Sequence, residues 1–153
     1  VVAAEVRSAF GEEVEDEVVK TVAMLMAWIE EMDEDEIYRH FDVAPGDLRV
    51  YIELFQWLGN AAARLAGMLG LEEHKRGLEV VTTRVVYGVR EELVELVTSL
   101  RGVGRVRARV LYNHGYKTLR DLAGATVGEL ARLSGIGEKL ASSIIEQARA
   151  GLR

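Results

Sequence analysis

The sequence predicts an all-α protein, in which a helical bundle over residues 1–97 is followed by a tandem helix-hairpin-helix domain over residues 98–153. Apolar residues recur at the three- and four-residue spacing of helices along most of the chain. The 153 residues include a single proline, Pro45, so long helices can run without interruption. The tripeptides Gly102-Val103-Gly104 and Gly135-Ile136-Gly137 each join two helical patterns, and their first glycines lie 33 residues apart.

The first helices follow from apolar spacing and from residues that cap helix ends. Residues 12–32 form one helical pattern, whose apolar positions are Val18, Val19, Val22, Leu25, Met26 and Ile29. Asp33 followed by Glu36 predicts a capping box that starts a short helix. A turn then leads into a long helix over residues 47–69, which Gly70 stops.

The next predicted helices lie before the first glycine tripeptide and between the two tripeptides. A helix is expected over residues 71–87, although its β-branched run at 80–83 also fits a strand. Gly88 ends this element, and another helix over 89–99 approaches the first tripeptide. Two further capping patterns pair Thr118 with Asp121 and Thr126 with Glu129. Charge and motif set the boundary between the two domains, because no low-complexity linker separates them.

The long helix carries a polar face and an apolar face. At 100° per residue, the polar face holds Arg49, Glu53, Gln56, Asn60 and Arg64. The apolar face holds Tyr51, Leu54, Phe55, Leu58, Ala62, Leu65 and Leu69. Trp57 lies at the border, where it either stacks on a nucleic-acid base or closes the edge of a helical core. Its position alone favours the core role.

Charge is distributed unevenly along the chain, whose formal net charge is −6. Residues 1–50 hold 14 acidic and 4 basic residues, whereas residues 101–153 hold 4 acidic and 10 basic ones. The positive end is therefore the end that carries both glycine tripeptides. A basic module of this kind favours a nucleic-acid partner despite the acidic total.

Each glycine tripeptide has the features of a phosphate-binding turn. Glycine lets the backbone turn tightly and approach a ligand closely. The helix that follows presents unpaired N–H groups and a partial positive charge, which together favour an anion. An alanine follows the second glycine by four residues in both copies, at Ala108 and Ala141. The alternative is a pair of glycine-rich helix ends without a ligand.

Other residue patterns argue against catalysis, metal binding and membrane insertion. The chain has no Gly-x-x-x-x-Gly-Lys-Ser/Thr loop, so we expect no ATP hydrolysis and no bound cofactor. Its three histidines are dispersed, cysteine is absent, and the acidic run at 33–36 suits a helix start better than a metal site. The apolar run at 22–29 is too short to span a bilayer. Without a signal-peptide pattern, a cytoplasmic location is expected.

Three segments together resemble a known family. They are WIEEMDEDEIYRHFDVAPGDLRVYIELFQWL, YGVREELVELV and LRGVGRVRARVLYNHGYKTLRDL. They resemble the C-terminal region of archaeal Ski2-like DNA helicases, the Hjm-type repair helicases of superfamily 2, which are related to the helicase part of polymerase theta. The similarity runs from about Val18 to Leu122 and more loosely to the end. The most specific features are Pro45-Gly46-Asp47, Trp57 and the arginine-rich hairpin helix.

The resemblance implies an architecture in which this chain is one part. Such helicases combine two RecA-like motor domains, a winged helix, a helical ratchet domain and a helix-hairpin-helix domain. This chain matches the last of these and part of the ratchet domain. ATP and Mg²⁺ would then act in motor domains elsewhere, driving 3'-5' unwinding. A first residue of Val1 rather than Met is also expected of a fragment.

The implied function is sequence-independent binding of single-stranded or forked DNA together with regulation of the motor. Expected partners are DNA, the motor domains and other repair proteins. Two alternatives remain open. One is a protein-interaction or autoregulatory module, and the other is a free-standing accessory protein that binds DNA junctions.

The resemblance also implies roles for particular residues. The helix over 47–69 would line the single-strand channel, with Trp57 stacked on a base. The family places an arginine two turns before that tryptophan, where this chain has Val50, so Arg49 or Arg64 would substitute. The family's Arg-x-Arg-Ala-Arg segment, which is implicated in holding DNA and restraining the motor, is matched at Arg105, Arg107, Ala108 and Arg109.

A helical wheel separates these arginines. Arg105 and Arg109 lie on one side and are expected to meet phosphates. Arg107 lies nearly opposite, and Leu140 takes its place in the second hairpin, so we expect it to be partly buried and to reach an acidic or backbone partner in the adjoining domain. The full set of expected DNA contacts is Arg49, Trp57, Arg64, Arg101, Gly102, Val103, Gly104, Arg105, Arg107, Arg109, Gly135, Ile136, Gly137 and Lys139.

The second hairpin carries less positive charge than the first. Glu138 and Lys139 stand where the first hairpin has Arg105 and Val106. We therefore expect the second hairpin to serve mainly as a packing partner, although its Gly-Ile-Gly turn keeps the form of a phosphate site.

Overall fold

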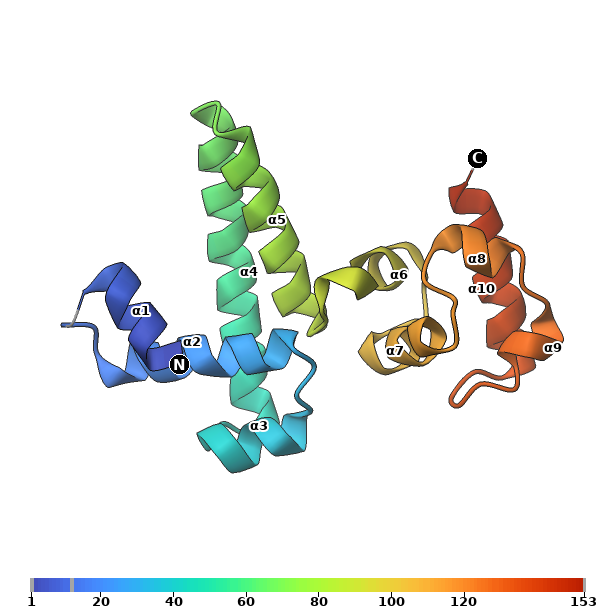
Figure 1. Ribbon diagram of the computed structural model, residues 1–153, viewed down its shortest axis with the longest axis horizontal. Helices are drawn as coiled ribbons and strands as arrows, with labels where there is room; N and C mark the ends of the chain where they lie inside the picture. Colours follow the sequence, from blue (N-terminus) through green and yellow to red (C-terminus); the bar gives the residue numbers. More distant parts are fainter. Residues whose placement is uncertain (1, 12, 153) are drawn as a thin grey trace. The chain divides into compact units, whose positions relative to one another are not determined.

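All regular secondary structure in the described residues, 2–11 and 13–152, is helical in the computed structural model of this protein (Figure 1), which confirms the all-α prediction. The elements are α1 (Val2–Phe10), α2 (Asp16–Ile29), α3 (Glu34–Phe41), α4 (Pro45–Met68), α5 (Glu72–Tyr87), a 3-10 turn η1 (Glu91–Leu93), α6 (Val94–Ser99), α7 (Arg105–Asn113), α8 (Leu119–Ala123), α9 (Val127–Leu130) and α10 (Glu138–Gly151). None of the described helices is long and apolar enough to cross a membrane.

The chain forms two compact units, Val1–Val89 and Arg90–Arg153. The division falls eight residues before the boundary expected at 97/98. The physical reason lies in η1 and α6, which both pack on α7. They bury Leu93, Leu96 and Val97. The helix that approaches the first hairpin is therefore part of the hairpin unit.

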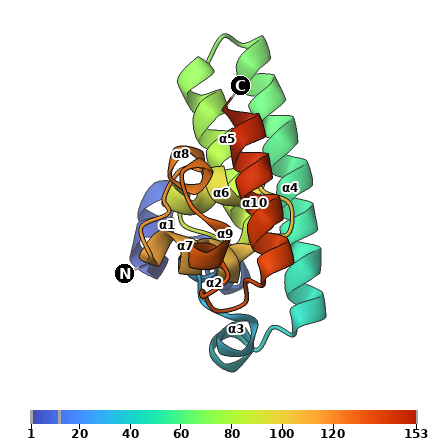
Figure 2. The same cartoon turned by 90° about the vertical axis from the view of Figure 1, so that its right-hand side faces the viewer.

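The first unit is built around the antiparallel pair α4 and α5, which lie side by side in Figure 1, and the turn that joins them is seen at the top of Figure 2. Residues 72–87 are helical, so the strand alternative is wrong. Thr82 and Val85 of α5 are buried, three residues apart on one side of the helix. Burial of this side against α4 outweighs the β-branched preference for strands.

Small residues form the side of α4 that faces inward. Gly59, Ala63 and Ala66 are buried there. A Cβ atom on Gly59 would overlap the Thr82 side chain, so the two helix backbones approach closely at this point. The hydroxyl oxygen of Thr82 is buried and has no hydrogen-bond partner in the described part of the chain.

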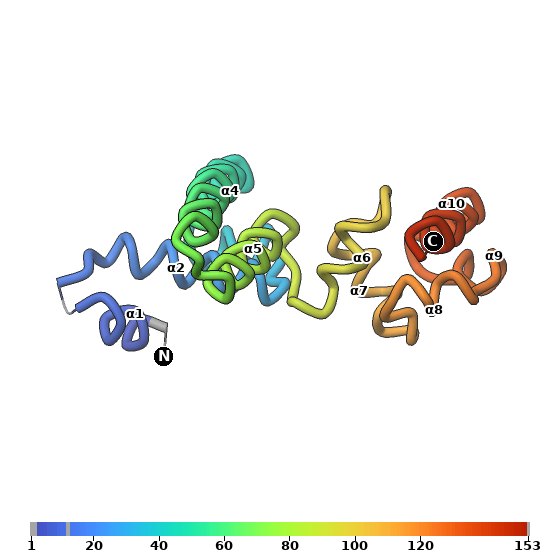
Figure 3. Tube along the Cα trace, turned by 90° about the horizontal axis from the view of Figure 1, so that it is seen from above, coloured from blue at the N-terminus to red at the C-terminus, as the bar shows by residue number. Residues whose placement is uncertain are grey.

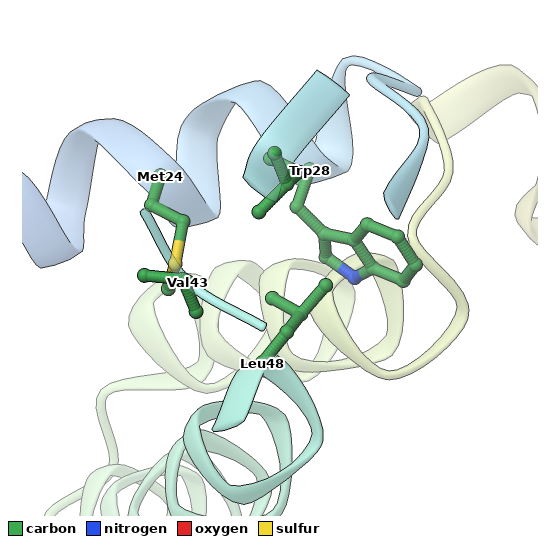
Figure 4. Close-up of a cluster of buried hydrophobic side chains, with 5 residues drawn as sticks. Met24, Trp28, Val43 and Leu48 are labelled. Carbon is green, nitrogen blue, oxygen red and sulfur yellow. The ribbon is translucent and has the colours of Figure 1, made fainter. Parts of the chain in front are cut away.

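A hydrophobic cluster joins α2 and α3 to the start of α4. Its buried members are Met24, Trp28, Ile37, Val43 and Leu48, and Figure 4 shows the Trp28 ring beside Leu48. The indole Nε1 of Trp28 donates a hydrogen bond of 2.8 Å to the carbonyl oxygen of Val85, which ties α2 to the end of α5.

The buried positions of α2 are not the apolar positions that predicted the helix. Val18 and Met26 belong to that predicted pattern and are exposed, whereas Met24 and Trp28 lie outside it and are buried. The helix begins at Asp16 and ends at Ile29, inside the expected range of 12–32, and residue 12 lies outside the described residues. Because apolar residues cover a wide part of the surface of this helix, the sequence pattern did not determine which side is buried.

The second unit is organised around α10, which packs on α8, α9 and α6 (Figure 3 shows α8 and α9 beside it). The predicted capping boxes are all present: Asp33 with Glu36 at α3, Thr118 with Asp121 at α8, and Thr126 with Glu129 at α9. The hydroxyl of Thr118 lowers the pKa of Asp121 by hydrogen bonding to its carboxylate, and the hydroxyl of Thr126 lowers the pKa of Glu129 in the same way.

Candidate nucleic-acid interface

The two glycine turns have the same backbone geometry. Gly102 (φ 82°) and Gly135 (φ 74°) adopt the left-handed conformation, in which side-chain-bearing residues are strained. The aliphatic residues that follow, Val103 and Ile136, are 3% and 2% exposed. Their N–H groups bond to the carbonyl oxygens three residues earlier, at 3.3 and 3.1 Å. Both predicted hairpins are therefore formed and anchored in the core.

The helices after the two turns begin without a capping side chain. Gly104 and Gly137 are the N-cap residues of α7 and α10, in extended conformation, and neither helix start has a side-chain cap. The starts of α2, α4 and α5 also lack a side-chain cap, whereas α3, α8 and α9 each begin with a capping box, so what sets α7 and α10 apart is the glycine turn before each of them. Neither helix start is thus closed by the side chain of its own N-cap residue, and the helix dipole favours an anion there.

An open hollow of about 380 Å³ lies at the start of α7. It is lined by Gly104, Arg105, Val106, Arg107, Ser134 and Gly135, so residues of both hairpins contribute to it. Two arginines and a helix N-terminus give this hollow a positive character.

The arginines of α7 make different contacts. Arg109 forms an ion pair of 2.9 Å with Glu92, and its guanidinium lies 5.2 Å from the centre of the Tyr112 ring. Lys117 lies over the same ring at 5.1 Å, so the aromatic ring carries two cations. Arg105 is half-buried at the start of the helix.

The contacts of Arg107 differ from the expectation that it reaches the adjoining domain. Its Nε donates to the carbonyl oxygen of Gly135 at 2.8 Å, and its Nη1 donates to that of Gly102 at 2.9 Å. These partners are backbone groups, as expected, but both lie in the same unit rather than in an adjoining domain. Arg107 is also exposed rather than partly buried, because it spans the surface between the two turns.

Two further expected contacts lie at the edges of the hairpins. Arg101 is exposed, and its backbone is held by the Gln147 side chain. That side chain accepts from the N–H of Arg101 at 2.8 Å and donates to its carbonyl oxygen at 3.3 Å. Lys139 is exposed at the start of α10. Both cationic side chains therefore face solvent near the glycine turns.

Two of the three DNA contacts expected on α4, Trp57 and Arg64, lie on one side of the helix, and the third, Arg49, does not. Trp57 is 68% exposed, which disagrees with the alternative that it closes the edge of a helical core. Arg64 is exposed about two turns further along the same side. Arg49 is turned away by about 80°. It lines a separate pocket of about 190 Å³ with Trp28 and Glu34.

Sequence reasoning assigned the wrong side of α4 to the core. Most of the expected apolar face is exposed, including Leu54, Leu58, Leu65 and Leu69. The signal that would have found the buried side is the row of small residues at Gly59, Ala63 and Ala66, whose three- and four-residue spacing permits close helix packing.

In the described part of the chain, acidic and histidine side chains do not gather into a metal site. No group of three or more His, Cys, Asp or Glu residues that could hold a metal ion occurs among residues 2–11 and 13–152.

Two family models match the chain, one for each unit. The model described as archaeal helicase, domain 4, matches residues 4–88, and the model described as a SAM-like helix-hairpin-helix tandem matches residues 94–150. Neither match is to a motor domain.

Relatives extend the same similarity across both units. The chain is 73% identical over 138 residues to the ATP-dependent DNA helicase Hel308 of Pyrobaculum calidifontis, covering 90% of this chain and 19% of that protein. It is 52% identical to the Hel308 of Caldivirga maquilingensis, with 84% and 17% covered. It is 41% identical to the Hel308 of Aeropyrum pernix, with the same coverage. The chain thus spans about a fifth of the length of these relatives. The resemblance to archaeal Ski2-like helicases is confirmed, and the chain belongs to the archaeal helicase domain 4 family, followed by a helix-hairpin-helix tandem.

Proposed function

We propose that this chain is the DNA-holding part of an archaeal Ski2-like repair helicase and binds single-stranded or forked DNA through the backbone, without regard to sequence. The observation that carries the proposal is the pair of matching glycine turns, which lead into helix starts with glycine N-caps at Gly104 and Gly137. Amide groups that lack a capping side chain can donate to phosphate oxygens, which are the same in every sequence.

The exposed side of α4 supports a second DNA contact within the same function. Trp57 offers an exposed aromatic face with Arg64 two turns away. Stacking of a base on such a ring contributes roughly 1–3 kcal/mol. We infer that this side meets the single strand while the hairpins hold the backbone.

In the whole protein, ATP and Mg²⁺ would be used by motor domains outside this chain to unwind DNA in the 3'-5' direction. This chain would hold the separated strand and restrain the motor. We expect such a protein in the cytoplasm, where archaeal DNA lies.

Replacing each N-cap glycine with aspartate tests the proposal. The Gly104→Asp side chain would cap the α7 amides itself and repel phosphate, and neither space nor backbone angle opposes it. We expect affinity for fluorescent forked DNA at low salt to fall about tenfold, with no loss of thermal stability. Gly137→Asp makes the same change at α10, so comparing the two variants shows whether the second hairpin also binds.

Gly128→Asp provides the matched control, because it adds the same charge on α9 at a position where a Cβ meets no neighbour. It should leave DNA affinity within about twofold. If the unaltered chain does not bind DNA at low salt, or if all three aspartates act alike, the proposal is overturned.

A second function is favoured by the exposed apolar side of α4. Leu54, Leu58, Leu65, Met68 and Leu69 are all more than half exposed there. Exposed apolar surface of this extent is typical of a protein interaction site. We propose that the motor domains are the partner, so a chain that binds no DNA but associates with those domains would favour this autoregulatory role.

A further inference from the structure

Side chains cross reciprocally between the two hairpins. Arg107 is the third residue of α7, and its Nε donates to the carbonyl oxygen of Gly135 in the other turn. Leu140 is the third residue of α10, and its Cδ1 lies 3.1 Å from where a Cβ on Gly102 would be. The same helix position in each hairpin thus reaches the first glycine of the other turn.

Arg107 makes a stronger connection than its counterpart, because it bonds to both turns at once. Its Nη1 donates to the carbonyl oxygen of Gly102 while its Nε is held by Gly135. The guanidinium is planar, so its donors keep a fixed geometry. Both acceptors belong to residues in the left-handed conformation. One rigid group therefore sets the distance between two rigid turns.

A second tie between the hairpins does not depend on Arg107. The Gln147 side chain of α10 bonds to both the N–H and the carbonyl oxygen of Arg101, next to the first turn. The aliphatic residues of both turns also remain buried in the core. Removing Arg107 should therefore loosen the spacing of the turns without unfolding the unit.

We propose that Arg107 is a positioning residue, which holds the two phosphate-binding turns at one spacing so that both engage the same DNA together. The proposal rests on the proposed DNA-binding function. Two linked sites bind more tightly than either one only when their geometry permits simultaneous contact. Both Arg105 and Arg107 line the hollow at the start of α7, and Arg107 uses its Nε and Nη1 in hydrogen bonds to the two turns.

The test uses Arg107→Ala and Arg107→Lys in the full chain. Without DNA, amide hydrogen exchange at Val103 and Ile136 should speed up in both variants, because lysine keeps the charge but cannot bridge the two carbonyls. Affinity for forked DNA should fall about fivefold or more in both, while the slope of log affinity against log salt stays unchanged.

A direct phosphate contact predicts different results. The salt slope would then fall in magnitude by about 0.9 in Arg107→Ala, Arg107→Lys would keep most of the affinity, and exchange at both turns would not change. That outcome overturns the proposal. Faster exchange with unchanged DNA affinity also overturns it.

Arg120→Ala is the control, since it removes one exposed positive charge from α8 in the same unit. It should leave exchange at both turns unchanged. If the unaltered chain binds no DNA, the proposed function fails and the positioning role fails with it. If the unaltered chain and Arg107→Ala bind DNA equally, only the positioning role fails.

Discussion

At the scale of single residues, Gly88 is the most constrained position of the first unit. It ends α5 with φ 62° and lies directly against the buried indole of Trp28. A side chain here meets two obstacles, the left-handed backbone and the ring. The sequence indicated only that Gly88 ends a helix.

Gly88→Ala should lower the free energy of unfolding of the first unit by roughly 2–4 kcal/mol, because it adds backbone strain to overpacking. Gly77→Ala is the control, since Gly77 lies within α5 with open space around it. That change should raise stability by about 0.5–1 kcal/mol. Denaturant unfolding followed by tryptophan fluorescence measures both. Equal effects of the two changes on the free energy of unfolding would contradict the close contact between Trp28 and Gly88.

Residues whose conformation depends on near neighbours were the ones that the sequence predicted well. The turns at Gly102 and Gly135 and the capping box at Asp33 need only a few adjacent residues. The burial of Trp28 depends instead on Val85, 57 positions away. No local pattern carries that information, so the sequence could not distinguish Trp28 from the exposed Trp57.

At the scale of secondary-structure elements, the contact of α4 with α5 depends on one close approach. Gly59 faces Thr82 with no room for a methyl group. The buried Thr82 hydroxyl has no hydrogen-bond partner among the described residues, which is a cost of close packing. The side of α4 that packs on α5 is therefore determined by the small size of its residues rather than by their hydrophobicity. This explains why the pattern of large apolar residues indicated the opposite side as the buried one.

Gly59→Ala should destabilise the first unit by about 1–3 kcal/mol through overpacking. Thr82→Ala alone should be nearly neutral, because it removes an unsatisfied hydroxyl along with a methyl group. In the double variant most of the loss should be recovered, giving a clear interaction energy in a double-mutant cycle. Strictly additive effects on the free energy of unfolding would show that the two positions do not meet.

At the scale of the whole molecule, the two units differ in charge. Residues 1–89 hold 18 acidic and 8 basic residues, a net charge of −10, whereas residues 90–153 hold 7 and 11, a net charge of +4. The overall acidity therefore describes only the first unit. A duplex or single strand would be attracted to the second unit and repelled by most of the first. The sequence already showed this asymmetry, while the position of the division required the structure.

The stability of the second unit should respond to acid. Two of its carboxyls, Asp121 and Glu129, have lowered pKa values because they accept hydrogen bonds from Thr118 and Thr126. Since their folded-state pKa values lie below the unfolded ones, the stability they contribute is present above the unfolded pKa and is lost as pH falls through the folded pKa. Replacing Thr118 and Thr126 with valine should therefore destabilise the second unit at neutral pH.

This difference between the valine variant and the unaltered chain should shrink below pH 4, as the carboxyls become protonated. Circular dichroism of denaturant unfolding at several pH values measures it. Serine at both positions keeps the hydroxyls and should preserve the behaviour of the unaltered chain. A difference that stays constant with pH would show that the caps act without their carboxylates.

The contrasting environments of the two tryptophans give the protein two built-in optical probes. Trp28 is buried and hydrogen-bonded, whereas Trp57 is largely open to solvent, and the sequence has no third tryptophan. A small soluble quencher will therefore extinguish the emission of Trp57 long before that of Trp28. What remains after quenching reports the integrity of the first unit, and what is quenched reports whatever approaches α4. Strand binding and unfolding can thus be followed separately in one unlabelled sample.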